Sequence, residues 1–267
     1  MPLSNDPYED PTRGATIRER PDEDPTAGSE VGETPFEDPT QEREVGEPPD
    51  EGMGSCRMKA IVVTDEAAGT AGMTLVERPM PEPAINEVVV QVHASGFTSG
   101  ELTWPSTWTD RVGRDRTPSI PGHELAGVVT ALGYGTTGLS VGQRVFGLAD
   151  WYRDGTLAEH VAVEARNLAP LPGDVDFTVG ASLPISGLTA WQGLFVHGRL
   201  QAGQSVLAHG AAGAVGSMVT QLARETGAYV IGTRRAADRR KALDFGAQEF
   251  VDLHNDALEA VGSVRCV

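Results

Sequence analysis

Residues 204–216 read QSVLAHGAAGAVG, and this stretch decides the fold. Residues 204–209 have the length and apolar content of a short buried strand. A glycine-rich turn follows, and apolar residues then recur at the 0, 3, 4, 7, 8 spacing of one helix face. They are Val215, Met218, Val219, Leu222 and Ala223. Gly227 supplies a helix stop, and residues 228–233 and 249–252 predict two more strands. Strand–helix–strand order of this kind is typical of a parallel α/β sheet.

The turn between the first strand and the helix has the glycine spacing of a phosphate-binding loop. Gly213 lets the backbone approach a pyrophosphate, and Gly216 lets the helix pack closely on the strand. The helix N-terminus adds free N–H groups and a partial positive charge. The pattern predicts a dinucleotide-binding Rossmann turn, with a plain α/β turn as the alternative. The expected contacts are Gly210, Ala211, Ala212, Gly213, Ala214, Val215 and Gly216. Ala211 stands where the fingerprint has its first glycine, which is tolerable if its φ stays negative.

The second strand ends in basic residues. An enzyme that uses NAD places Asp or Glu about 20 residues beyond the fingerprint to hold the ribose hydroxyls. Here Thr233, Arg234 and Arg235 occupy the end of the strand, and Arg239 follows. Arginine suits an anionic 2′-phosphate, to which it donates charge-assisted hydrogen bonds. We therefore predict NADPH as the cofactor, with these four residues as contacts.

Residues 1–57 form an acidic, repetitive segment. They carry 16 acids and five arginines, a net charge of −11, whereas the remaining residues carry a net charge of only −6. Glu-Asp-Pro-Thr occurs three times, beginning at Glu9, Glu23 and Glu37. The copies are too short and polar to stack as a solenoid, and their proline and charge predict disorder. We expect a tail that is dispensable for folding; a role in docking a partner stays open.

Charge and cysteine content exclude several classes. An ordinary acidic balance beyond residue 57 argues against nucleic-acid binding, which needs a basic face. Cys56 and Cys266 lack any CxxC or Cys/His neighbour, so neither a disulfide framework nor a zinc cluster is predicted. No apolar run reaches the roughly 18 residues of a membrane span, and the N-terminus lacks a signal peptide's pattern. We expect a cytoplasmic protein without a membrane partner.

Short strands with Gly/Pro punctuation precede the parallel sheet. They are predicted at residues 59–64, 74–78, 87–94, 124–131, 143–147 and 156–163. Such a series suggests a compact β-barrel-like domain. The expected division is a disordered tail (1–57), a barrel-like domain (58–182) and a partial Rossmann domain (183–267).

Six stretches, in order, carry a family resemblance. They are MKAIVV (58–63), EVVVQVHASGF (87–97), PGHELAGVV (121–129), VGQRVFG (141–147), SGLTAW (186–191) and HGAAGAVG (209–216). With them, residues 58–252 resemble the medium-chain dehydrogenase/reductase superfamily, in particular its zinc-independent quinone oxidoreductase branch, which is alcohol dehydrogenase-like. The resemblance implies an α/β protein with a GroES-like β-barrel domain followed by a Rossmann doubly wound parallel sheet. It also implies NADPH and hydride transfer to a small-molecule quinone, enone or related conjugated carbonyl.

The zinc ligands of related enzymes are not matched. Zinc-dependent relatives use a Cys, a His and a Cys where this sequence has Thr98, His123 and Ile185. Threonine and isoleucine cannot act as thiolate ligands, so one imidazole remains of a set of three. We expect no zinc, and we interpret His123 as a hydrogen-bonded structural residue.

The resemblance also implies a set of residues around the reacting atoms. Thr189 should contact the nicotinamide amide, and Thr98 and Glu101 lie in the loop that meets the nicotinamide. Hydride would go to an electrophilic β-carbon, with protonation by solvent or a side chain. Tyr152 is a candidate proton donor or substrate contact; the alternative is an ordinary surface-loop aromatic. A homodimer is compatible with a full-length relative but is not expected of this chain.

Other enzyme classes lack their motifs here. A short-chain reductase needs Tyr-x-x-x-Lys, and neither Lys59 nor Lys241 follows a tyrosine at that spacing. No P-loop motif occurs, and the one G-x-S-x-G match (138–142) lies in a turn between two predicted strands, not between a strand and a helix, so the common hydrolase and P-loop classes are excluded.

The parallel sheet is expected to be incomplete. A doubly wound sheet has the strand order 3-2-1-4-5-6. The sequence supplies strands 1 to 3, and residues 260–267 offer at most a stub of strand 4. We therefore expect a C-terminally truncated enzyme that is inactive or nearly so. The alternative to a working oxidoreductase is a catalytically incompetent reductase that retains only partial cofactor binding.

Overall fold

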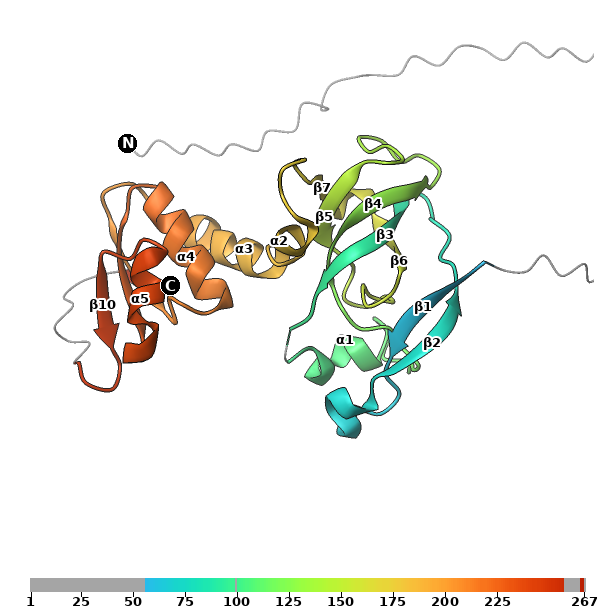
Figure 1. The fold of residues 1–267 in the computed structure, drawn as a ribbon, viewed down its shortest axis with the longest axis horizontal. Coiled ribbons are helices and arrows are strands. Elements are labelled where there is room, and N and C mark those ends of the chain that lie inside the picture. Colours follow the sequence, from blue (N-terminus) through green and yellow to red (C-terminus); the bar gives the residue numbers. More distant parts are fainter. Residues whose placement is uncertain (1–55, 99, 257–264, 267) are drawn as a thin grey trace, which may run out of the picture. The chain divides into compact units, whose positions relative to one another are not determined.

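A computed structural model describes residues 56–98, 100–256 and 265–266 (Figure 1). The predicted disorder of residues 1–57 falls almost wholly outside the described residues and stays a prediction. Within the described part of the chain, no helix has both the length and the apolar character that crossing a membrane requires.

The first half of the described chain is built from antiparallel strands. β1 (Arg57–Val62) and β2 (Thr74–Pro79) form a hairpin. The others form a five-stranded sheet of order β6-β3-β4-β5-β7. Their bounds are β3 Glu87–Gly96, β4 Glu124–Leu132, β5 Arg144–Leu148, β6 His160–Glu164 and β7 Leu168–Pro170. Val88, Val90, Leu125, Val129 and Val145 are fully or almost fully buried and make up much of its core. The sequence predicted every strand of this sheet except the three-residue β7.

This sheet does not close into a barrel. The order of the described strands is linear, and the β1–β2 hairpin meets the rest through isolated bridges such as Ala60↔Ala158 and Val63↔Ser119. The predicted strand at 156–163 begins only at His160. Its first residues use their backbone groups elsewhere: Leu157 accepts a hydrogen bond from Ile61 N–H, and Glu159 donates one to the Lys59 carbonyl. The described strands of the predicted barrel-like domain therefore form no closed barrel, because this segment is divided between the hairpin and the sheet.

Short helices surround and follow this sheet. They include α1 (Pro105–Trp108), α2 (Phe177–Ala181) and α3 (Pro184–Trp191), and α3 continues as the π-helix η4 (Gln192–His197). Short 3₁₀ turns lie at Glu66–Gly72, Glu101–Thr103, Ala165–Asn167 and Ala236–Asp238. Pro184 occupies the first turn of α3, where a missing N–H leaves no helical hydrogen bond unmade.

The second half is a parallel sheet of order β10-β9-β8-β11. Its strands are β8 Ser205–His209, β9 Tyr229–Arg234, β10 Glu249–Asp252 and β11 Arg265–Cys266. In doubly wound numbering this is 3-2-1-4, so the predicted order and the stub of strand 4 are confirmed. The helices are α4 (Ala214–Glu225) and α5 (Arg239–Asp244).

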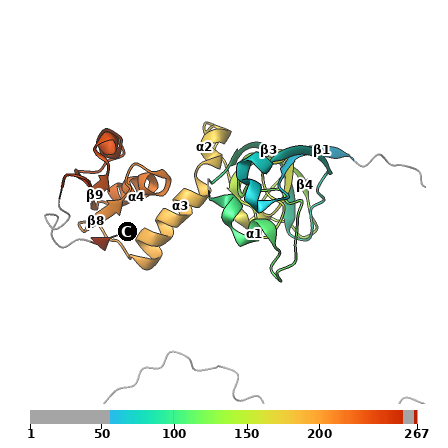
Figure 2. The same cartoon turned by 90° about the horizontal axis from the view of Figure 1, so that it is seen from below.

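Helix α4 packs its predicted apolar face on the sheet. Val219 and Ala223 are buried, and Val215, Met218 and Leu222 pack against the same core. The helix ends as predicted: Gly227 has a φ of +84°, and its N–H donates to the Arg224 carbonyl at 2.8 Å. Figure 2 shows α4 alongside β8 and β9.

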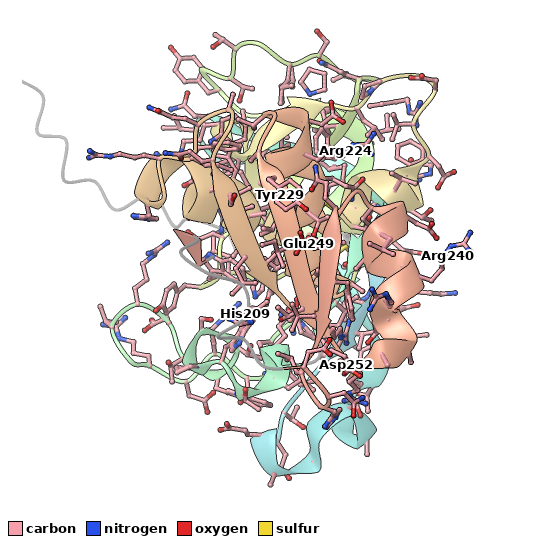
Figure 3. All side chains as sticks on the ribbon, turned by 90° about the vertical axis from the view of Figure 1, so that its left-hand side faces the viewer. His209, Arg224, Tyr229, Arg240, Glu249 and Asp252 are labelled. Atoms are coloured by element: carbon pink, nitrogen blue, oxygen red, sulfur yellow. The ribbon has the colours of Figure 1, made fainter. Side chains whose placement is uncertain are left out.

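Parallel pairing gathers the strand ends. In Figure 3, His209 and Asp252, the last residues of β8 and β10, lie at one end of the sheet. Tyr229 and Glu249, the first residues of β9 and β10, lie at the other, where the Tyr229 hydroxyl donates to Glu249. Nucleotides bind beyond the carboxyl ends of such sheets, so the His209–Asp252 end is the one to examine for a cofactor.

Candidate functional site

The turn after β8 is held to the end of β9. Gly210 has a φ of +68°, which favours glycine. The N–H groups of Gly210 and Ala211 donate to the Thr233 carbonyl at 2.8 and 3.2 Å, and Gly213 N–H donates to the Gly210 carbonyl at 2.7 Å. These four hydrogen-bonding residues fix the turn before any ligand arrives.

Two close contacts explain the small residues in this turn. A Cβ atom at Gly216 would lie 2.1 Å from the Gly210 carbonyl oxygen, so only glycine lets α4 approach the turn this closely. Ala211, the departure from the fingerprint, has no positive φ: among the described non-glycine residues only Asn86 and Arg199 do. Its Cβ lies beside Gly232 of β9, where an added Cβ would come within 2.7 Å of it.

The N-terminus of α4 is open to an anion. Gly213 is the N-cap residue and has no side chain with which to cap the helix. The N–H groups of Ala214, Val215 and Gly216 have no acceptor within the helix, and the helix dipole adds partial positive charge there. A glycine cradle with unsatisfied N–H groups has the chemistry that suits a phosphate.

Thr233 contributes to this turn through its backbone. Its side chain is fully buried, and its Oγ1 lies 3.0 Å from His209 Nδ1. The sequence named Thr233 as a cofactor contact but did not single out His209. Position alone gives a signal for His209, because it is the last residue of β8, immediately before the glycine turn.

The three arginines differ in their surroundings. Arg234 Nε lies 3.1 Å from Asp238 Oδ2, and Arg234 Nη1 lies 3.5 Å from where a Cβ at Gly213 would stand. Arg235 is exposed; its carbonyl accepts a hydrogen bond from Asp238 N–H at 2.9 Å, and its side chain forms no hydrogen bond or ion pair with the described residues. The guanidinium of Arg239 lies 5.7 Å from the centre of the Phe250 ring.

Asp238 was missed from the sequence. It follows Arg234 by four residues, and this i,i+4 spacing, at which oppositely charged side chains pair on a helical turn, is the signal that could have found it. The end of β9 therefore carries an acid as well as arginines, although the acid belongs to the following 3₁₀ turn.

The loop after β3 is organised around a buried carboxylate. Glu101 is fully buried and accepts hydrogen bonds from the Gly122 N–H and, at 3.3 Å, from the Thr98 N–H. Burial raises the pKa of Glu101, an effect that these two N–H groups oppose and the nearby Glu124 carboxylate reinforces. Thr98 and Glu101 are thus brought together, as the resemblance implies.

His123 lies in an aromatic pocket. It is 2% exposed, and its ring centroid is 4.5 Å from that of Trp151 and 6.0 Å from that of Trp104. Burial, reinforced by the Arg116 charge, lowers the pKa of His123 to about 4. The prediction of a hydrogen-bonded histidine was wrong with respect to the described residues. Neither ring nitrogen has a hydrogen-bond partner among them, and Nε2 lies 3.5 Å from Glu101 Oε1 without hydrogen-bond geometry.

The positions that correspond to zinc ligands have other local partners. Ile185 N–H donates to Glu124 Oε1 at 2.8 Å, which ties α3 to β4. Burial raises the pKa of Glu124. Across the described residues, no three His, Cys, Asp or Glu side chains are grouped to hold a metal ion. The absence of zinc stays a prediction.

The remaining two candidates lie on other elements. Tyr152 is 37% exposed, its ring is 4.9 Å from the Arg111 guanidinium, and with Trp104, Ser106 and Trp151 it lines a shallow pocket of about 320 Å³. Its hydroxyl forms no hydrogen bond with the described residues. Thr189 is exposed on α3, and its hydroxyl donates to the Ile185 carbonyl at 2.6 Å.

Comparison with known proteins identifies relatives of both halves. The "Alcohol dehydrogenase GroES-like domain" family matches residues 84–173. Rat quinone oxidoreductase is 35% identical over 179 residues, which cover 67% of this chain and 53% of the rat protein. The chain thus spans about half the length of the curated quinone oxidoreductases it matches.

Solved structures agree with the sequence relatives. The quinone oxidoreductase of Coxiella burnetii superposes with a TM-score of 0.67 at 27% identity, covering 78% of this chain and 66% of that one. A mycobacterial protein solved as a complex with NADPH gives a TM-score of 0.64 at 32% identity, covering 77% and 62%.

These relatives confirm the predicted fold class, an α/β protein with a GroES-like domain and a Rossmann-type sheet. They are named for oxidoreductases, so the alternative of a catalytically incompetent remnant is not favoured. The chain belongs to the medium-chain dehydrogenase/reductase superfamily, an oxidoreductase family, and is similar to its quinone oxidoreductases.

Proposed function

We propose that this chain binds NADPH at the β8–α4 turn and acts without zinc in hydride transfer to a quinone, enone or related conjugated carbonyl. One observation carries the choice of cofactor: the Arg234 guanidinium reaches the glycine turn, 3.5 Å from a Cβ position at Gly213, and the adjacent Arg235 is exposed and unpaired among the described residues. A 2′-phosphate is the part of NADPH that NADH lacks, and two arginines beside the turn suit it.

NADPH, when bound, supplies the hydride. The chain's part is to bind and orient it: N–H groups of Ala214, Val215 and Gly216 would hold the pyrophosphate, and Arg234, Arg235 and Arg239 the 2′-phosphate. Gly210, Ala211, Ala212 and Gly213 shape the turn, with Thr233 holding it from β9. Thr189, on α3, remains the proposed contact for the nicotinamide amide.

On the substrate side, the three candidates take different parts. Glu101 is fully buried, so we assign it the positioning of Thr98, whose N–H it binds. Thr98 would face the nicotinamide ring. Tyr152 is the proposed substrate contact or proton donor, because the residue is exposed and its hydroxyl is bonded to no described residue.

The proposal keeps the division into a substrate-side domain (58–182) and a cofactor-binding domain (183–267). The GroES-like match at 84–173 lies within the first. A small-molecule partner and a cytoplasmic location belong to the same proposal.

Titration of tryptophan fluorescence with NADPH and with NADH tests the cofactor. We expect tighter binding of NADPH, and Arg235→Glu should weaken NADPH about tenfold while leaving NADH within about twofold, on the scale of one solvent-exposed charge-assisted bond. Arg240→Glu is the matched control, because Arg240 is exposed and paired with Asp244 on α5. Equal affinities of the unmodified chain for both cofactors would refute the NADPH assignment.

Turnover is tested separately. Oxidation of NADPH, followed at its absorbance band, is expected in the presence of a simple naphthoquinone and not in its absence. Binding of NADPH without such turnover would contradict the catalytic part of the proposal for this chain while leaving its cofactor part intact.

A further inference from the structure

The ion pair between Arg234 and Asp238 has a particular orientation. The contact with Asp238 Oδ2 is made by Arg234 Nε, at 3.1 Å. A guanidinium carries one N–H on Nε and four on its two Nη atoms. Asp238 thus contacts the Nε edge of the guanidinium, and neither Nη atom forms a hydrogen bond with the described residues, so both Nη atoms are available to another anion.

One of these atoms, Nη1, lies beside the glycine turn. Nη1 of Arg234 is the side-chain atom nearest to a Cβ position at Gly213, at 3.5 Å. Gly213 is the N-cap of α4, and its neighbour Gly210 is fixed by hydrogen bonds to Thr233, the residue before Arg234. The guanidinium thus spans from the 3₁₀ turn at Ala236–Asp238 to the phosphate-binding turn.

We propose that Asp238 is a positioning residue for cofactor selection: it holds Arg234 through Nε so that its Nη edge is presented to the 2′-phosphate of NADPH. The inference rests on the proposed function. Long arginine side chains lose rotamer freedom when they bind, and an arginine already held in place loses less. A carboxylate next to a phosphate site then strengthens phosphate binding, although its charge alone would oppose it.

A purely electrostatic role and a positioning role of Asp238 predict opposite effects of Asp238→Asn on the affinity for a 2′-phosphate. If Asp238 acts only as a negative charge, Asp238→Asn removes repulsion and tightens binding of a 2′-phosphate. If Asp238 positions Arg234, the same substitution weakens binding of the 2′-phosphate. We expect a two- to fivefold loss, on the scale of one partly exposed ion pair.

The experiment uses the full chain and calorimetric titration with 2′,5′-ADP, which carries the 2′-phosphate, and with 5′-AMP, which does not. The readout is the ratio of the two affinities, which a general loss of structure would not change selectively. Asp238→Asn should lower the ratio, whereas Asp238→Glu, which keeps a carboxylate, should retain more of it. Asp244→Asn is the matched control, because Asp244 forms the same i,i+4 contact with Arg240 Nε, at 3.0 Å, on the exposed side of α5.

A double-mutant cycle asks whether Asp238 acts through Arg234. In an Arg234→Ala background, Asp238→Asn should no longer change the ratio. An unchanged or raised ratio in the Asp238→Asn single variant would overturn the inference while leaving NADPH as the cofactor. If the unmodified chain itself binds 2′,5′-ADP no better than 5′-AMP, the proposed cofactor and this inference both fail.

Discussion

Replacing Gly216 with alanine tests how closely α4 approaches the turn. The new Cβ would lie 2.1 Å from the Gly210 carbonyl oxygen, and separations under 3.0 Å essentially never occur for real Cβ atoms. Helix and turn must therefore separate by about 1 Å. The obstacle is backbone, and the turn is itself bonded to Thr233, so no side-chain rotation relieves it.

The expected cost follows from this geometry. Overpacking costs about 1–3 kcal/mol, and we expect the upper part of that range because backbone must move. In a folded unit of this size each kcal/mol lowers the melting temperature by about 2–4 °C, so a cost of about 2–3 kcal/mol should make Gly216→Ala melt about 4–12 °C below the unmodified chain. Helix propensity points the other way, since alanine in a helix is favoured over glycine by up to about 1 kcal/mol.

Gly187→Ala is the control that separates these effects. Gly187 lies in α3 with a φ outside the positive range and nothing within 4 Å of its Cβ position. Gly187→Ala should raise the free energy of unfolding by about 0.4–1 kcal/mol. Thermal unfolding followed by circular dichroism, without cofactor, measures both variants. A Gly216→Ala variant that melts with, or above, the unmodified chain would refute the close-approach argument.

Three further predictions address the substrate side. Because burial lowers the pKa of His123 to about 4, the unfolded chain binds a proton there first as pH falls, so this group's contribution to stability is present above about pH 6.5 and is lost toward pH 4. Between these pH values the free energy of unfolding, measured in urea, should fall by up to about 3 kcal/mol less for His123→Phe than for the unmodified chain. Parallel pH profiles of the two proteins would contradict the burial argument. Tyr152→Phe should slow quinone reduction and leave NADPH affinity unchanged in fluorescence titration, and full activity would exclude the hydroxyl as proton donor. Metal analysis of protein prepared without chelator should find no stoichiometric zinc, and one zinc per chain would overturn the ligand-count argument at Thr98 and Ile185.

Much of the parallel half could be predicted because its signals are local. A buried strand, a glycine turn and an apolar stripe at helical spacing lie within 20 residues, and each depends on its own sequence. The prediction of Glu249–Asp252 as a strand matches β10 at both ends. The need for a small residue at Gly216 also followed, since its close contact is with a residue only six positions away, whereas the role of Gly213 beside a pyrophosphate stays a prediction.

What the sequence could not supply are relations between distant segments. Whether the antiparallel strands close into a barrel depends on which backbone groups residues 156–159 bond to. Strand propensity does not distinguish between the β1–β2 hairpin and the five-stranded sheet as the partner. His123 was misjudged because its neighbours, Trp104 and Trp151, come from separate loops. The sequence spacing of Asp238 indicates a pair with Arg234, but spacing cannot tell that the contact is made at Nε and that neither Nη atom has a hydrogen bond with the described residues.

The contact between Ala211 and Gly232 shows how a missing fingerprint glycine can be replaced. Where the turn crosses β9, one of the two facing residues must be a glycine. In this chain the glycine is Gly232 of β9, and the turn has an alanine, Ala211. Gly232→Ala alone would bring two Cβ atoms within 2.7 Å, whereas the same change with Ala211→Gly removes that clash and leaves ordinary contacts to Ala242 and Ala247. The two positions should therefore be epistatic, and each single exchange should have an effect that depends on the other. A sequence motif that covers the turn alone would fail to detect chains in which the strand supplies the glycine, because the steric constraint applies to the pair of residues.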